Sequence, residues 1–122
     1  QILQVAIGKG EENIRFFEIP ETGLSTGDED IANEHRIRGF EVLETEVPLL
    51  SLSDLLDRMG TRDIHWLKID VEGMEKSVLE SWAFSEKRPW IVVVESTRPL
   101  QPEVAFEGWE NILVEKGYRF VI

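Results

Sequence analysis

The chain has no cysteine among its 122 residues, so it can form neither a disulfide nor a thiolate metal site or nucleophile. It is also short of basic residues: 13 Lys and Arg face 24 Asp and Glu, giving a net charge of -11. That charge repels phosphate groups and argues against nucleic acid or an anionic membrane as the main partner. No apolar run approaches the roughly 20 residues of a membrane span, and the sequence does not open on a basic segment followed by an apolar one. These absences favour a soluble, cytoplasmic protein.

The length allows one domain at most, with a core that buries roughly two-thirds of the unfolded surface. Both ends read as strands without polar tails, Gln1 to Ile7 and Tyr118 to Ile122. Domain boundaries normally lie in exposed polar linkers. We therefore expect residues 1–122 to be part of a longer domain.

The most informative segment runs from Trp66 to Glu75, where an apolar strand leads into carboxylates, a glycine and an amphipathic helix. A second strand, Trp90 to Glu95, follows one helix later and also ends on an acid. The pattern predicts a strand-helix-strand crossover with two adjacent parallel strands. Ligands bind at the carboxyl ends of such strands.

Three acids are therefore candidate site residues: Asp70, Glu72 and Glu95. Strands spaced about 4.8 Å apart should bring Asp70 and Glu95 within about 10 Å of each other. Asp70 and Glu72 also have a structural interpretation as acids that stabilise a helix N-terminus by about 0.3–1 kcal/mol. Glu95 follows four apolar residues, so it must leave the core or be paired. Three carboxylates could also hold Mg²⁺ or Ca²⁺, but their spacing fits no known binding loop.

Two further titratable residues receive weaker assignments. His35 is a candidate base, although a histidine in a polar loop is more often a surface residue. Glu75, in the first turn of the helix after the strand, is expected to be solvated.

The rest of the chain predicts a parallel sheet with flanking helices and an amino-terminal hairpin. A long polar loop, 21–39, has a possible helical turn near residues 31–35. The expected elements are the hairpin strands Gln1 to Ile7 and Asn13 to Ile19, a strand around Val42 to Val47, the helices Leu52 to Met59 and Gly73 to Trp82, a last helix from Phe106 to Leu113 stopped by Gly117, and the strand Tyr118 to Ile122.

The segment Leu67-Lys-Ile-Asp-Val-Glu-Gly-Met-Glu75 resembles the signature K-I-D-V-E-G-x-E of FkbM-type methyltransferases. Val5 to Gly8, Val47 to Leu56 and Ile91 to Glu95 are similar to other strands and turns of that family. Leu24-Ser-Thr-Gly27 and Arg88-Pro-Trp90 resemble a bacterial branch often found beside or fused to glycosyltransferases.

The resemblance implies a class I, Rossmann-like α/β fold and transfer of a methyl group from S-adenosylmethionine to a hydroxyl oxygen of a small-molecule or saccharide acceptor. It places Ala6 and Ile7 towards the cofactor, Asp70 near the transferred methyl, and Glu72 and Glu95 on the acceptor side. The family's glycine-rich cofactor loop and its ribose-binding acid lie on two strands before the one that begins this sequence. The acceptor's identity is not encoded in any of these motifs.

Two other functions compete with this one. A non-catalytic α/β module that binds a partner or tethers a glycosyltransferase would share the fold. A nucleotide-dependent oxidoreductase is weaker, because the chain has no G-x-G-x-x-G. In class I methyltransferases the strand here at Leu67 to Val71 pairs with an earlier strand, so an open sheet edge predicts a homo-oligomer.

We predict that the 122-residue chain alone binds S-adenosylmethionine weakly or not at all. The few remaining contacts cannot offset the several kcal/mol of lost ligand freedom. Titration calorimetry on this chain, and on a version extended upstream by its native sequence, measures the difference. Micromolar binding by residues 1–122 alone would contradict the prediction.

Overall fold

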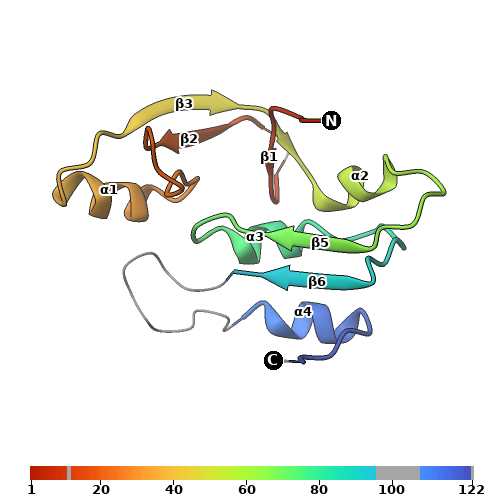
Figure 1. The fold of residues 1–122 in the computed structure, drawn as a ribbon. Coiled ribbons are helices and arrows are strands. Elements are labelled where there is room, and N and C mark those ends of the chain that lie inside the picture. Colours follow the sequence, from red (N-terminus) through yellow and green to blue (C-terminus); the bar gives the residue numbers. More distant parts are fainter. Residues whose placement is uncertain (11, 96–107, 122) are drawn as a thin grey trace.

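A computed structural model describes residues 1–10, 12–95 and 108–121 (Figure 1). The elements of this part follow in chain order: β1 (Ala6–Ile7), β2 (Ile14–Glu18), α1 (Glu29–Ile37), β3 (Leu43–Val47), β4 (Leu49–Leu50), α2 (Leu52–Asp57), β5 (Trp66–Ile69), α3 (Glu75–Glu80), β6 (Ile91–Val94) and α4 (Glu110–Glu115). No helix in these ranges is both long and apolar enough to cross a membrane.

The described strands form three separate pairs rather than one continuous parallel sheet. β5 and β6 run parallel, as the predicted crossover requires, with Trp66 opposite Ile91 and Ile69 opposite Val94. β1 and β4 form a second, short parallel pair. β2 and β3 are antiparallel. The structure is therefore α/β, and its central crossover is the predicted one.

The predicted amino-terminal hairpin is wrong. β1 covers only Ala6–Ile7 and pairs with β4, while β2 pairs with β3. Backbone hydrogen bonds from Ala6 N to Pro48 O (2.8 Å) and from Gly8 N to Leu50 O (3.1 Å) extend the β1 pairing. Pairing β1 with β2, as predicted, or with β4, as found, would satisfy the same backbone N–H and C=O groups of β1. The local sequence pattern therefore does not determine which strand β1 pairs with.

One hydrophobic core lies between the β5–β6 pair and the helices α2, α3 and α4. It contains Leu52, Leu56, Ile69, Val78, Leu79, Trp82 and Trp109. α2 begins where the sequence predicted, because the Ser51 hydroxyl accepts a hydrogen bond from Asp54 N. α4 ends at the predicted glycine: Gly117 has φ +95°, and the following Tyr118 N–H donates to Leu113 O.

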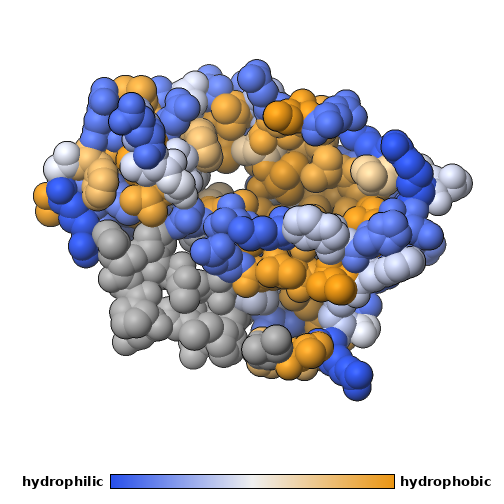
Figure 2. All heavy atoms as spheres, viewed as in Figure 1, coloured by the Kyte–Doolittle hydropathy of each residue, from blue (hydrophilic) through white to orange (hydrophobic). Residues whose placement is uncertain are grey.

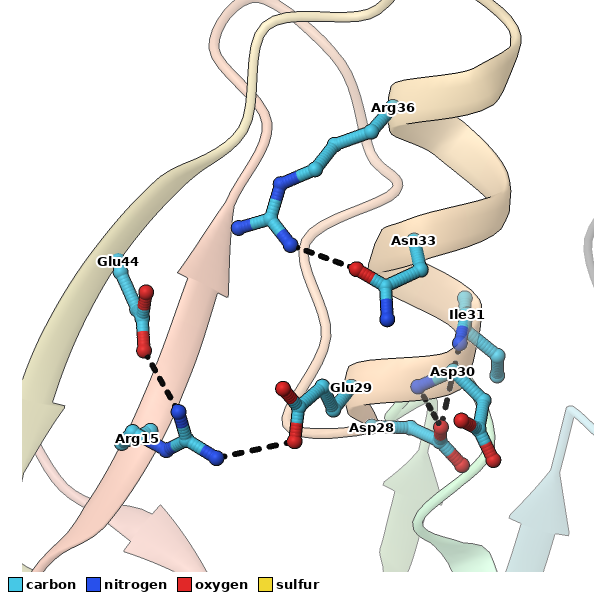
Figure 3. A network of polar contacts seen from close by, with 8 residues as sticks. All are labelled: Arg15, Asp28, Glu29, Asp30, Ile31, Asn33, Arg36 and Glu44. Atoms are coloured by element: carbon cyan, nitrogen blue, oxygen red, sulfur yellow. Dashed lines mark hydrogen bonds and ion pairs between the residues drawn. The ribbon is translucent and has the colours of Figure 1, made fainter.

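The loop predicted at residues 21–39 instead contains a full helix, α1, packed beside β2 and β3. Asp28 caps it by accepting hydrogen bonds from Asp30 N and Ile31 N. Arg15 on β2 forms ion pairs with Glu44 on β3 and Glu29 on α1, each at 2.9 Å (Figure 3). These exposed pairs contribute little stability each, but they fix the first turn of the helix beside both strands.

The predicted strand at Tyr118 to Ile122 is also wrong, since the described residues 118–121 form no strand. Tyr118 instead donates its hydroxyl hydrogen to Pro89 O and packs against Trp82. Phe106, predicted in the last helix, lies outside the described residues.

The face of the β5–β6 pair opposite the core is exposed. Trp66 and Ile91, which are directly opposite in the register, expose 63% and 60% of their surface, and Val93 exposes 46%. Figure 2 shows apolar side chains gathered over β6 on this face. Exposed apolar patches of this kind mark contact surfaces.

We expect two copies of the chain to associate through this face, because Trp66, Ile91 and Val93 give it an exposed apolar surface and the charge of Lys68 beside them is paired with Asp70 and Glu95. Sedimentation equilibrium should show a concentration-dependent dimer or larger oligomer. Ile91→Lys should shift it towards monomer, whereas Ile37→Lys, at an equally apolar but separate exposed position, should not. A monomer at every concentration would contradict this expectation.

Candidate active site at the strand ends

Asp70 and Glu95 follow the last residues of β5 and β6, and a single lysine joins them. The Lys68 ammonium lies 3.2 Å from Asp70 Oδ2 and 3.5 Å from Glu95 Oε2. The two carboxylates are therefore separated by no more than the sum of these distances, which confirms that they share one edge of the sheet. Glu95 N also donates to Ile69 O at 2.9 Å, so the parallel pairing continues to the site.

Lys68 was not among the residues selected from sequence. A signal was present, because residues two apart in a strand share a face and Lys68 precedes Asp70 by two. The side chains of Asp70, Lys68 and Glu95 are 38%, 47% and 51% exposed, so a ligand can reach all three. The hydrogen bond that Lys68 donates to Asp70, followed by the negative charge of Asp70, raises the pKa of Lys68.

Glu72 lies in the turn between β5 and α3 and is half-buried. Burial raises its pKa above the usual value, and the charges of Asp70, Glu95 and Glu75 raise it further. Two of these neighbours, Asp70 and Glu95, are the acids selected from sequence together with Glu72, so all three lie close enough for their charges to interact. One lysine does not neutralise them, so the site keeps a negative potential.

The backbone of this turn is strained. Glu72 has φ +48° and Gly73 has φ +103°, both in the left-handed region that residues other than glycine rarely adopt. The Thr26 hydroxyl, fully buried, donates to Glu72 O at 2.7 Å and holds the strained peptide in place. Strained residues held by their surroundings occur most often at functional sites.

Gly73 is required by packing as well as by its backbone angle. A Cβ at this position would overlap Ile31 Cδ1 and contact Asp28. Glu75, expected to be solvated, is instead buried, and its Oε1 accepts a hydrogen bond from Gly73 N at 3.1 Å. α1 therefore packs directly on the turn that carries the acids.

The structure does not bring the remaining candidates to this cluster. His35 lies on α1, is 1% exposed and contacts the edge of Phe40. Neither ring nitrogen has a hydrogen-bond partner among the described residues. The surface location expected for His35 is wrong, and its assignment as a base stays a prediction that this burial does not favour.

Ala6 and Ile7 lie on β1, which shares no sheet with β5 in the described structure. The end of β1 packs over α3, where Lys9 N donates to Ser77 Oγ at 3.1 Å. Their assignment to the cofactor stays a prediction. Among the described residues no group of three metal-ligating side chains is placed to hold a metal ion.

Open α/β sheets bind their ligands at the carboxyl ends of the strands, which is where these carboxylates gather. A model of the methyltransferase FkbM domain matches residues 1–120. The chain belongs to the FkbM methyltransferase family, as its motif predicted, and membership indicates transfer of a methyl group from a methyl donor. No curated protein and no solved structure matches it.

We predict that Gly73→Ala lowers the free energy of unfolding by about 3 kcal/mol, since it adds both backbone strain and overlap with Ile31. Gly39→Ala is the matched control, because Gly39 has φ +90° and open space around it. The control should lose only about 1 kcal/mol for the backbone angle. Urea denaturation measures both. Equal losses would show that Ile31 can move aside.

Proposed function

We propose that this chain forms part of an S-adenosylmethionine-dependent O-methyltransferase that acts on a hydroxyl group of a carbohydrate or related natural product. The observation that carries the proposal is the cluster of Asp70, Glu72 and Glu95 at the ends of two parallel strands. This cluster lies inside the segment that matches the family. The acceptor class comes from the family resemblance.

The charges at the site fit a cationic ligand. S-adenosylmethionine, when bound, supplies an electrophilic methyl group on a positively charged sulfur. Asp70 and Glu95 are accessible and only partly neutralised by Lys68. Their potential favours a cationic donor over the neutral product that remains after transfer. Asp70 is the residue assigned nearest to the methyl.

Glu72 is the residue best suited to accept the proton of the acceptor hydroxyl. Its raised pKa makes its carboxylate a stronger base than that of an ordinary glutamate. Its left-handed backbone, held by Thr26, fixes where the side chain leaves the turn. Glu95 lines the same edge and helps to orient the acceptor. A positioned base of this kind contributes roughly 10²–10⁴-fold.

Association with a glycosyltransferase, in the same polypeptide or beside it, is part of this proposal. It would supply a saccharide acceptor to the site. The exposed face of the β5–β6 pair is compatible with either this partner or a second copy of the chain.

The experiment is a methyl-transfer assay on the protein with its native upstream sequence, using labelled S-adenosylmethionine and a panel of saccharides. Asp70→Asn should lower kcat by at least about 10²-fold, because it removes a charge beside the reacting methyl. Glu72→Gln should lower kcat and remove the fall in kcat that the parent shows as the pH is lowered. In the parent this fall reports protonation of Glu72. Its midpoint is expected at a higher pH than for an ordinary glutamate, since burial raises the pKa of this group.

The control for the loss of one negative charge is Glu34→Gln, which removes an exposed acid on α1. Unchanged kcat in Asp70→Asn and Glu72→Gln, together with lowered melting temperatures, would show that these acids only stabilise the turn. Alkali-stable product is expected, because methyl ethers resist hydrolysis and methyl esters do not.

A further inference from the structure

A second candidate site lies at the opposite end of the crossover from the acids. A cavity of about 470 Å³ opens where α3 and α4 end and where the chain enters β6. Three basic side chains line it: Lys9, Arg88 and Lys116. In a chain with a net charge of -11, such a concentration of cations is unexpected.

Two of these cations lie over one buried aromatic ring. Arg88 Cζ is 5.3 Å and Lys116 Nζ is 4.9 Å from the centre of the Trp82 indole. Trp82 is 1% exposed, so it forms the floor of the cavity beneath them. Among the described residues, no carboxylate lies within 4 Å of Arg88 or Lys116.

The guanidinium of Arg88 is held in place by the backbone. Its Nη1 donates to Ser85 O and to Lys87 O, each at 2.9 Å. A guanidinium fixed in this way presents its remaining N–H groups with little further loss of freedom. These donors match the oxygens of a phosphate or carboxylate group.

The cations repel one another in the absence of an anion. Burial, and next the charge of Arg88, lower the pKa of Lys116. Of the two acids in the lining, Glu80 is engaged by Lys9 at 3.1 Å, which leaves Glu115 to balance Arg88 and Lys116. An anion between Arg88 and Lys116 would offset the repulsion between the two cations.

We propose that this cavity is a second binding site that takes the phosphate group, or a similar oxyanion, of a small ligand. Arg88 and Lys116 bind the oxyanion, and Trp82 holds both cations towards it. The cavity contains none of the acids at the strand ends, so the result of testing it does not depend on the methyltransferase proposal.

The test is a titration with inorganic phosphate and with glucose 6-phosphate at constant ionic strength, followed by NMR shifts of the Trp82 indole N–H. We expect saturable shifts, and about tenfold weaker binding in each of Arg88→Gln and Lys116→Gln, since each removes a charged hydrogen bond. The control is Arg38→Gln, which removes an exposed cation at the end of α1 that does not line the cavity, and this variant should bind as the parent does.

Tighter binding of glucose 6-phosphate than of phosphate would support a phosphorylated small molecule as the ligand. Equal binding would support recognition of the oxyanion alone. Shifts that do not saturate, or equal affinities in the parent, Arg88→Gln and Lys116→Gln, would overturn the proposal. Lys116→Gln keeps the test decisive if Arg88→Gln, which also loses two backbone hydrogen bonds, fails to fold.

Discussion

The turn that joins β5 to α3 is the constraint on which the site depends. Its backbone at Glu72 and Gly73 adopts left-handed angles, and the buried Thr26 hydroxyl holds the Glu72 carbonyl. Because Ile31 leaves no room for a side chain at Gly73, α1 can pack on the turn only if this residue is glycine. The strain at Glu72 costs about 1–3 kcal/mol, and contacts from a segment more than 40 residues earlier in the chain offset it. The acids owe their positions to that distant support.

The crossover separates charge between its two ends. Carboxylates gather where β5 and β6 end, and Lys68 alone is paired with them among the described residues. Arg88 and Lys116 gather at the other end, above Trp82. Like charges that lie close together destabilise a folded chain. Two such clusters are therefore costly, and they are typical of positions that bind oppositely charged ligands.

Burial is as unevenly distributed as charge. The helices α2, α3 and α4 cover one face of the β5–β6 pair, and Trp66, Ile91 and Val93 remain exposed on the other. Within the described ranges the three strand pairs do not join one another, so each strand has an edge without a strand partner there. Strands with one bare face and one open edge ordinarily pack against another element.

Sequence by itself determined that β5 and β6 form a parallel crossover, that Asp70 and Glu95 lie at the same edge of it, and that the chain belongs to the FkbM family. Local patterns carry that information: an apolar run defines a strand, glycine permits the turn, and residues at matching strand ends must meet. Ser51 and Gly117 were predictable as helix boundaries for the same reason. Tertiary structure decided the rest. β1 pairs with β4 instead of β2, His35 is buried, Glu75 bonds to Gly73, and Lys68 joins the two acids. These outcomes depend on which distant segments compete for the same backbone and volume, and local periodicity does not encode that competition.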